Sequence, residues 1–344
     1  MLVADIGEFE LIDRLESSVR NRNCVQFDLL RDLGVSVELG IGDDAAAWSY
    51  PDSTVVGTTD TMVENIHFIV GKTPWRELGW KALASNLSDI GAMGCSPTFA
   101  LVTLGLRSDI PIRGLIEMYD GMMDVLEHTG GALAGGDIVR SDTFFVSVAL
   151  EGISESRTHI LRRDAARSGD AIAVTGHLGC SAGGLQLILG ESQAQGLDTA
   201  IRRHLISTHN RPQPRVAHGI ALRKLGVRCA MDVSDGLIAD LSKVCAASGL
   251  SALIEADRVP ADSHLRTAFP TDWLRLALGG GEDYELVFCA DDLTMENVIS
   301  ELGNCVTVIG RMADGEPGVT VLNSNGAEVV VETSGWDHFT AQHG

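Results

Sequence analysis

Residues 230–241, AMDVSDGLIADL, contain the pattern that best defines the fold. An apolar run ends at Asp232, a short polar turn follows, and apolar residues then recur at helical spacing. Ser234 and Asp235 stand where a helix N-cap is expected, and Gly236 permits a tight turn between the two elements. The segment therefore predicts a strand, a loop and a helix whose N-terminus is suited to bind an anion.

The same alternation of strands and helices continues on both sides of this segment. Apolar spacing predicts helices at 9–20, 75–93 and 112–129, and strands at 54–60, 99–106, 144–152, 171–176 and 284–290. Such elements form mixed sheets flanked by helices, an α/β (α+β mixed) fold. A chain of 344 residues is long enough for two domains. We place them at 1–152 and 153–344, joined by the basic stretch 157–170.

The composition narrows the classes of partner. The chain is 45% hydrophobic, which is ample for a core, and its formal net charge is −21. Such an acidic chain is unsuited to nucleic acid and to anionic membranes. An anionic substrate remains compatible with it, because magnesium bridges carboxylates to phosphates.

The cellular compartment is indicated by cysteines and by the apolar runs. Seven cysteines form no CxxC pair, and the odd number argues against a disulfide framework. The first residues, MLVADIGEFELIDRL, have no apolar core of a signal peptide, and no run of eighteen apolar residues predicts a membrane span. We therefore expect a cytoplasmic protein.

Carboxylates lie in glycine-rich loops or near the ends of predicted elements at six places along the chain. In GIGDDAA, Asp43 and Asp44 are adjacent, and neighbouring carboxylates repel each other unless a cation or donors compensate. Asp60 ends an apolar strand beside threonine hydroxyls in TTDTMVENIHF, and these oxygen ligands suit magnesium. Each segment also has a purely structural interpretation, as a solvated turn or an Asx or Ser/Thr turn.

Two further acids lie in apolar or glycine-rich surroundings. Asp89 shares a helix face with Ser85 and Asn86, which precede it by four and three residues. Asp137 follows two glycines in GGALAGGDIVRS, a segment that we expect to form a loop. Backbone N–H groups of glycine-rich loops bind phosphates, although this one lacks the GKS or GKT of a Walker A loop.

The remaining acids complete the pattern. In DVSDGL, capping of the helix would account for Asp235 but not for Asp232 as well. In ALGGGEDYELVF, Glu282 and Asp283 follow three glycines. Acids at six such places favour a phosphate site with several magnesium ions over six unrelated turns. His67, in the apolar context NIHF, is by its pattern alone a structural residue.

These segments together resemble one known family, the thiamine-monophosphate kinases of the aminoimidazole ribonucleotide synthetase superfamily. The matching motifs run in the family's order from residue 7 to 339: GEFELIDRL, GIGDDAA, TTDTMVENIHF, KALASNLSDIGAMG, GGDIVRSD, VTGHLGCSAGGL, HNRPQPRV, DVSDGLIADL, GGGEDYEL and GWDHF. The resemblance covers essentially the whole chain. The family often has Ser where this chain has Thr58, a difference that keeps the hydroxyl.

The resemblance implies a role for each motif. Magnesium ligands are implied at Asp43, Thr58, Thr59, Asp60, Asp89, Asp137, Asp232 and Asp235. ATP contacts are implied at Gly136, Asp137, Arg163 and Ser234, with Arg162 as the alternative to Arg163. Thiamine phosphate contacts are implied at His67, Glu282 and the C-terminal aromatic residues Trp336 and Phe339. The residues expected to take part in catalysis are Asp60, Asp137 and Arg163.

The resemblance also implies an assembly and a reaction. The N-terminal domain would bind metal and ATP and form a homodimer, and the C-terminal domain would complete the ATP and substrate site. Magnesium is the implied cofactor, and ATP and thiamine phosphate are the implied substrates. Because a phosphate oxygen is already anionic near neutral pH, in-line transfer needs alignment and charge neutralisation rather than a strong base.

Two alternatives remain at this point. The first is another ATP-dependent synthetase of the superfamily that acts through a phosphorylated intermediate. One synthetase of the superfamily needs a reactive cysteine in a glycine-rich N-terminal loop, and Cys24 lacks that context. Another relative needs a C-terminal cysteine, and this sequence ends in AQHG. The second is a nucleotide-binding regulator without turnover, which retention of every expected acid disfavours.

Overall fold

The computed structural model describes residues 8–39, 47–50, 54–154, 160–190 and 196–330. The chain divides into two compact units. The N-terminal unit comprises Met1–Ile90 and Cys95–Thr158, and the C-terminal unit comprises Gly91–Gly94 and His159–Gly344. Four residues discussed above lie outside the described residues: Asp43, Asp44, Trp336 and Phe339.

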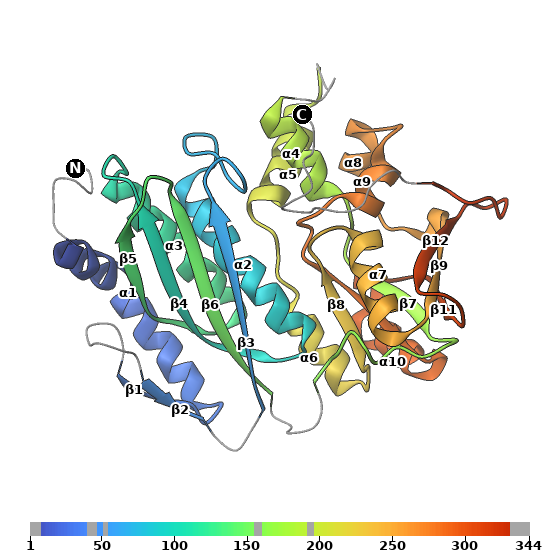
Figure 1. Ribbon diagram of the computed structural model, residues 1–344, viewed down its shortest axis with the longest axis horizontal. Helices are drawn as coiled ribbons and strands as arrows, with labels where there is room; N and C mark the ends of the chain where they lie inside the picture. Colours follow the sequence, from blue (N-terminus) through green and yellow to red (C-terminus); the bar gives the residue numbers. More distant parts are fainter. Residues whose placement is uncertain (1–7, 40–46, 51–53, 155–159, 191–195, 331–344) are drawn as a thin grey trace. The chain divides into compact units, whose positions relative to one another are not determined.

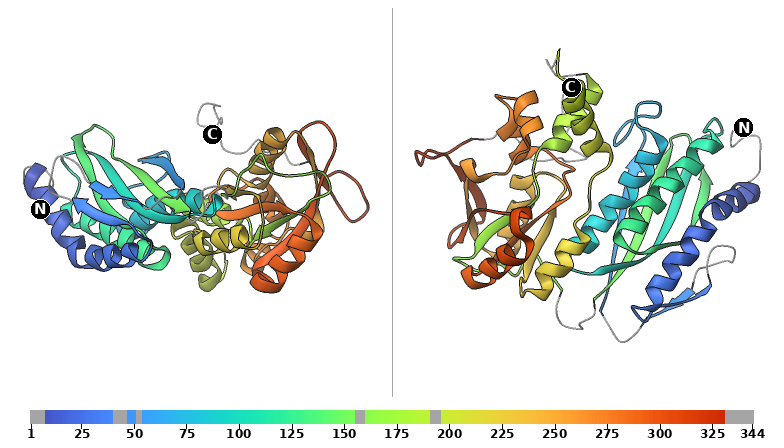
Figure 2. Two further views of the ribbon diagram at one scale, coloured as in Figure 1. Left: turned by 90° about the horizontal axis from the view of Figure 1, so that it is seen from below. Right: turned by 180° about the vertical axis from the view of Figure 1, so that it is seen from behind.

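The N-terminal unit is built on a four-stranded mixed sheet in the order β3-β6-β4-β5. Its strands are β3 (Thr54–Val63), β4 (Ser96–Leu106), β5 (Ala132–Arg140) and β6 (Phe145–Ser154). Helices α2 (Trp75–Ala92) and α3 (Ile112–Thr129) cover one face, while α1 (Glu8–Arg31) packs along α3 and β5 (Figures 1 and 2). A separate two-stranded sheet pairs β1 (Ser36–Leu39) with β2 (Ala47–Ser49).

Alternation along the strands separates the two faces of this sheet. Val146, Val148 and Leu150 of β6 are each 1% exposed and belong to the helix-covered face, while Ala149 between them is exposed. This is the period of two expected where one face is buried. Among the described residues, the opposite face carries no helix and is turned to the viewer in Figure 1.

The segment that we expected to form a glycine-rich loop is instead strand β5, which pairs in parallel with β4. At Gly136, a Cβ would lie 1.8 Å from the carbonyl oxygen of Val102. Only glycine therefore fits where the two backbones meet. Local composition predicted a loop, but pairing with β4 and the β4-α3-β5 crossover make the segment a strand.

The C-terminal unit is built on a six-stranded sheet in the order β12-β9-β11-β7-β10-β8. All neighbours are antiparallel except β12 and β9. The strands are β7 (Ala171–Thr175), β8 (Cys229–Val233), β9 (Ser251–Glu255), β10 (Glu285–Ala290), β11 (Val306–Ala313) and β12 (Gly318–Leu322). The helices are α4 (Cys180–Leu189), α5 (Thr199–Asn210), α6 (Val216–Lys224), α7 (Leu237–Ser248), α8 (Ser263–Ala268), α9 (Trp273–Gly279) and α10 (Asp292–Leu302), with 3₁₀ turns at Ala256–Arg258 and Gly303–Cys305.

Helices cover both faces of this sheet, so its central strands are buried throughout. Ile172 and Val174 of β7 pack in one core with α7, whereas Ala171 and Ala173 pack in another with α6 and α10. Strands covered on both sides are expected to be continuously apolar, as β7, β8 and β10 are, apart from Thr175, Asp232 and Glu285.

A third core of this unit joins four helices beside the sheet. It consists of buried residues of α4, α5, α8 and α9 with the residue following α8: Cys180, Leu187, Leu205, Leu265, Phe269 and Leu276. We refer to α4, α5, α8 and α9 as the helical cluster.

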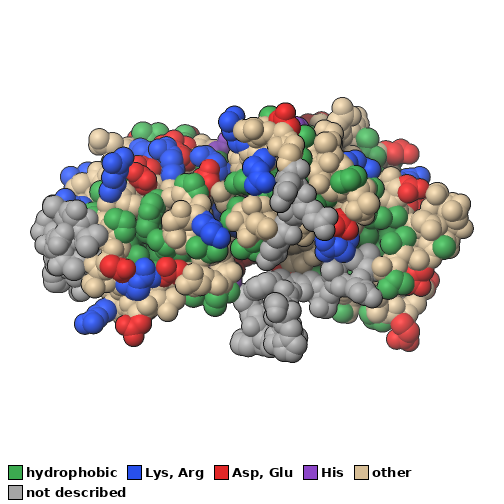
Figure 3. Space-filling view, turned by 90° about the horizontal axis from the view of Figure 1, so that it is seen from above, with side chains coloured by type: hydrophobic (Ala, Val, Ile, Leu, Met, Phe, Trp, Pro, Cys, Tyr) green, Lys and Arg blue, Asp and Glu red, His purple; other side chains and the backbone are tan. Residues whose placement is uncertain are grey.

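The observed elements confirm the predicted α/β class with two domains of mixed sheets and flanking helices. No helix of the described part is long and apolar enough to cross a membrane. Although acids outnumber bases 47 to 26, Figure 3 shows basic side chains interspersed with acidic ones on the surface seen from above.

Candidate functional site

In the N-terminal unit, an oxygen-rich group forms between edge strand β3 and helix α2. The Thr58 hydroxyl donates to a carboxylate oxygen of Asp89 at 2.5 Å, and the backbone N–H of Asp60 donates to Asn86 Oδ1 at 3.1 Å. Because β3 is an edge strand, its outward N–H groups are available to a helix side chain. Thr58 and Asp60 thus lie on the side of β3 that meets Asn86 and Asp89 of α2. Asp60 does not end the strand as expected, because β3 continues through pairing with β6 to Val63.

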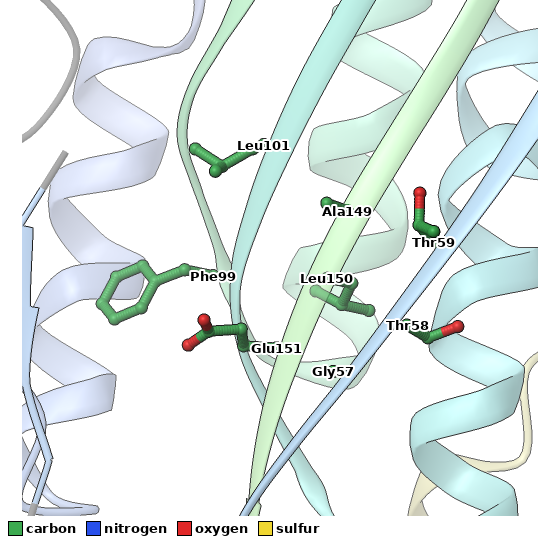
Figure 4. Close-up of a pocket in the computed structure, with 8 residues that line it drawn as sticks. All are labelled: Gly57, Thr58, Thr59, Phe99, Leu101, Ala149, Leu150 and Glu151. Carbon is green, nitrogen blue, oxygen red and sulfur yellow. The ribbon is translucent and has the colours of Figure 1, made fainter. Parts of the chain in front are cut away.

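Strand alternation separates Thr59 from this group. Thr58 and Asp60 are half-buried on one face of β3, whereas Thr59 is exposed on the other. Figure 4 shows the Thr58 hydroxyl directed toward α2, away from Phe99 and Leu101. Three consecutive residues of a strand cannot all point to one side, so Thr59 is not gathered with the other two in this unit.

Asp137 also lies away from Asp60. Strands β6 and β4 stand between β3 and β5, and the register aligns Asp60 with Gly136 across the sheet, so Asp137 points to the opposite face. Asp137 is exposed, and one of its carboxylate oxygens accepts the backbone N–H of Ile138 at 2.9 Å. Its role as a metal ligand stays a prediction.

His67 lies in the turn that follows β3. Its Nδ1 accepts the backbone N–H of Val63 at 3.0 Å. The half-buried imidazole therefore closes a turn of the chain, which agrees with the structural interpretation of NIHF; its contact to substrate stays a prediction.

A hollow of about 460 Å³ opens on the helix-free face of the N-terminal sheet (Figure 4). Its lining is mostly apolar and includes Phe99, Leu101 and Ala149, with Glu151 at one side. Among the described residues that line it, Glu151 is the only acid.

In the C-terminal unit, two loops carry the remaining candidates and lie side by side. The backbone N–H of Glu282 donates to the Ser234 carbonyl at 2.7 Å, and that of Tyr284 donates to Val233 at 2.9 Å. Gly236 has φ +115°, and a Cβ there would lie 2.8 Å from the backbone of Gly279. The loop after β8 and the loop before β10 are thus held against each other by their backbones.

A buried carboxylate, Asp240, organises the first of these loops. One of its oxygens accepts the backbone N–H groups of Ser234, Asp235 and Gly236 at 2.9, 2.9 and 3.1 Å. The helix begins at Leu237 with Gly236 as its N-cap, and no side chain caps it there. The N-cap is therefore Gly236, not Ser234 or Asp235 as the sequence suggested, and the N–H groups that Asp240 binds belong to the loop before the helix. Anion binding at the helix N-terminus stays a prediction.

Lys243 links Asp240 to the predicted metal ligand Asp235. Its ammonium group lies 2.8 Å from Asp240 Oδ1 and 2.5 Å from Asp235 Oδ2. Burial lowers the pKa of Lys243, but hydrogen bonds to Asp235 and Asp240 outweigh it, so the pKa is raised and the amine is charged at neutral pH. Any cation bound by Asp235 must share this carboxylate with Lys243. Asp232, two residues before this loop, is 5% exposed at the end of β8.

Glu282 has a strained backbone beside this loop. Its φ is +66° and that of Tyr284 is +52°, values that residues other than glycine seldom adopt. Such strain is often found at ligand sites. Glu282 Oε2 lies 3.5 Å from Nδ1 of the buried His209, and that nitrogen is 3.1 Å from the Ser181 hydroxyl. The Glu282 side chain remains 28% exposed and accessible to a substrate.

Two neighbouring acids have structural partners. Asp283 accepts the backbone N–H groups of Gly179 and Ser181 at 2.6 and 3.2 Å, and burial raises its pKa to about 8. Glu285 binds Arg215 through two hydrogen bonds of 2.5 and 2.6 Å. Asp283 thus holds the start of α4, and Glu285 fixes the start of β10 to Arg215.

The two arginine candidates differ in their surroundings. Arg162 forms a two-bond pair with Asp164, at 2.8 and 2.6 Å. The Arg163 side chain is exposed and forms no ion pair with any described residue, while its carbonyl accepts the Ser248 hydroxyl at 3.1 Å. An uncommitted guanidinium is better suited to a phosphate, which favours Arg163 over Arg162 without testing either.

Sequence reasoning missed Asp240 and Lys243 as organisers of the loop. Their only signal is an acid and a base three residues apart in an otherwise apolar first half of a helix. It also missed His209, whose partners Ser181 and Glu282 come from distant parts of the chain.

Comparisons with known proteins agree with this picture. Residues 42–154 match the model for "AIR synthase related protein, N-terminal domain", and residues 167–322 match that for its C-terminal domain. A thiamine-monophosphate kinase of Escherichia coli O157:H7 is 37% identical over 97% of this chain and 98% of its own. The crystal structure of a thiamine-monophosphate kinase from Stenotrophomonas maltophilia K279a is 36% identical, with a TM-score of 0.78 over 94% of this chain and 98% of that one. AaThiL complexed with AMPPCP and TMP is 31% identical, with a TM-score of 0.75 over 97% and 98%.

Proposed function

Because the chain belongs to the AIR synthase related family and, within it, to the thiamine-monophosphate kinases, we propose that it transfers the γ-phosphoryl group of ATP directly to the phosphate of thiamine phosphate. The chain is a thiamine-phosphate kinase, a transferase whose acceptor is a phosphate group. The products are thiamine diphosphate and ADP. This identity selects the kinase over the synthetase and regulator alternatives.

One observation carries this proposal. A relative that aligns over 97% of this chain was solved with AMPPCP, an ATP analogue, and TMP, which we take as thiamine monophosphate. Both substrates of the proposed reaction are therefore bound together by the same fold.

The donors of the chain fit magnesium. Thr58, Asp60 and Asp89 offer a hydroxyl and two carboxylates within one group, and the nearly buried Asp232 adds a carboxylate in the other unit. Hard oxygen donors of this kind suit magnesium, which also binds substrate phosphates. We propose Thr58, Asp60 and Asp89 as magnesium ligands of the N-terminal unit and, separately, Asp232 as a magnesium ligand of the C-terminal unit, with Asp43, Asp137, Asp235 and Thr59 as further candidates. When bound, magnesium supplies positive charge that neutralises the polyphosphate.

The described residues around the β8–α7 loop then position the nucleotide. Asp240 holds the three backbone N–H groups of the loop, so the Ser234 hydroxyl is the group left to contact an ATP phosphate. Arg163 supplies a planar cation that suits phosphate oxygens. No side chain has to remove a proton, because the attacking phosphate oxygen is already an anion.

Recognition of the acceptor falls to the loop before β10. Glu282 offers a carboxylate to the aminopyrimidine amine or to the cationic thiazolium ring of thiamine. Its strained backbone and its bond to Ser234 place that carboxylate next to the proposed nucleotide loop. His67, Trp336 and Phe339 are further proposed contacts, and aromatic rings stack on such heterocycles.

A homodimer through the N-terminal unit forms part of this proposal. The helix-free face of the four-stranded sheet exposes Val55, Leu101 and Val139, at 44, 37 and 40%, around the hollow of Figure 4. Apolar side chains on an uncovered sheet face favour burial against another surface. A second copy of the same face would bury them. A cytoplasmic location is supported by the seven cysteines, all of which are free thiols.

The stereochemistry at phosphorus tests direct transfer. ATP made chiral at its γ-phosphorus with oxygen isotopes would be incubated with thiamine phosphate and the purified chain. A single in-line transfer inverts the configuration of the phosphoryl group in thiamine diphosphate. Retention would reveal two transfers through a phosphorylated enzyme and would refute the direct mechanism.

A further inference from the structure

We propose that Cys180, His204 and Asp262 bind a transition-metal ion, with zinc as the best match, in the helical cluster of the C-terminal unit. One ligand atom from each of these residues lies within 4.8 Å of those of the other two. The inference does not rest on the proposed kinase function, because none of the three belongs to the proposed magnesium or nucleotide residues.

The three side chains come from three elements that the fold holds together. Cys180 is the first residue of α4, His204 lies within α5, and Asp262 is the N-cap of α8. Nε2 of His204 lies 3.8 Å from Oδ1 of Asp262. The apolar core of the helical cluster fixes the helices around this point, so only small side-chain movements would close the site around an ion.

A fourth residue, His264, orients the carboxylate. Its Nδ1 and its backbone N–H both lie 2.7 Å from Oδ1 of Asp262. Its ring also lies beside the His204 ring, with centroids 4.3 Å apart. Hydrogen bonds of this kind to a metal-bound carboxylate are the usual support of a metal site.

The donor types decide which metal fits. A thiolate, an imidazole and a carboxylate are a soft, a borderline and a hard donor, a mixture that zinc accepts in tetrahedral sites with a water as fourth ligand. Magnesium prefers oxygen donors alone, so it would not compete here. Exposure also differs between donors: Cys180 is buried, whereas the His204 and Asp262 side chains are 42 and 23% exposed, which provides an entry path.

One property of the thiol opposes binding. Burial, with the carboxylates of Asp283 and Asp262 nearby, raises the pKa of Cys180, so the ion must displace a proton. The ion's own charge provides the compensation, since a coordinated thiol is deprotonated.

A bound ion would also act on the neighbouring substrate loop. Gly179 and Ser181, on either side of Cys180, donate their backbone N–H groups to Asp283, the residue after Glu282. Fixing Cys180 therefore fixes the start of α4 against this loop. The role that follows is structural, a tie between α4, α5 and α8.

Cobalt(II) provides the test, because a thiolate bound to tetrahedral cobalt gives an intense near-ultraviolet charge-transfer band that oxygen ligands do not give. The full chain, reduced and stripped of metal, would be titrated with cobalt in excess magnesium, which saturates the oxygen sites. We expect the band to rise to one equivalent and to disappear on addition of zinc.

Variants assign the band to its ligands. Cys180→Ser and His204→Gln should each abolish it, and the second changes only a partly exposed side chain, so it guards against a folding defect in the first. The matched control is Cys305→Ser, which removes an exposed thiol of the same unit and should keep the band. A wild-type chain without the band, or a band that survives either ligand variant, would overturn the proposal, whatever the kinase activity of the sample.

Discussion

Replacing Glu282 by Gln should raise KM for thiamine phosphate while leaving KM for ATP nearly unchanged. The substitution keeps the size of the side chain and removes its charge. A hydrogen bond to a charged group contributes about 1.5–3 kcal/mol. Because Glu282 is 28% exposed, solvent screens part of this, and we expect a loss near the lower end. A loss of about 1.5–2 kcal/mol corresponds to a ten- to thirtyfold higher KM.

The comparison variant is Glu285→Gln, three residues along the same segment. Glu285 is buried and bonded to Arg215 and Thr175, so its neutralisation leaves a largely buried arginine without its anion. Breaking such a pair costs about 3–5 kcal/mol of stability, and chemical denaturation would measure it.

Steady-state kinetics with each substrate varied separately tests the role of Glu282. An unchanged KM for thiamine phosphate, or an equal change for ATP, would refute its assignment to the acceptor.

Three further variants test other parts of the account. Asp60→Asn should lower turnover at least tenfold with little change in stability, because the bond from its backbone to Asn86 remains; an unfolded variant in circular dichroism would make Asp60 structural. Leu101→Glu should convert a dimer to a monomer in light scattering, and a wild-type monomer would end the dimer proposal. Asp283 holds a proton in the folded state up to pH about 8, well above its ordinary pKa of 3.8. Its contribution to the free energy of unfolding is therefore present below pH 3.8 and is lost as pH rises toward 8. The free energy of unfolding of Asp283→Asn, measured by chemical denaturation, should lack this decline. Parallel pH dependences of the free energy of unfolding in the variant and the wild type would contradict this assignment.

Much of the fold follows from local patterns in the sequence. The strong apolar periodicity of 112–129 predicted α3 with its observed bounds, and Pro111 before it fits the helix start. Helix α1 extends to Arg31, well beyond the predicted 9–20. Its second half exposes Val25 and Leu29, so apolar positions on both sides obscured the period there.

The misplaced segment is β5. Gly135 and Gly136 lower any local preference for a strand, and only parallel pairing with β4 across the α3 crossover makes one. Such pairing is a property of the tertiary structure, which a local pattern does not contain.

The candidate site shows the same division. Asp60 was expected to end a strand, but β3 continues to Val63 and Asp60 lies within it. The place of Asp89 on a helix face was predictable, because it depends on the period of one element. The separation of Asp137 from Asp60 was not, because it depends on the strand order β3-β6-β4-β5. The use of Asp240 to bind the loop's N–H groups depends on the fold of the loop itself, and no spacing rule identifies it.

The most direct test of the central claim is the acceptor dependence of ATP turnover. The purified chain would be incubated with ATP and magnesium, and with thiamine phosphate, free thiamine or an aminoimidazole precursor in turn, while ADP and thiamine diphosphate are quantified together. We predict one thiamine diphosphate for each ADP with thiamine phosphate, and no product in excess chelator. ADP formation that is indifferent to thiamine phosphate, or that releases inorganic phosphate without thiamine diphosphate, would contradict the account.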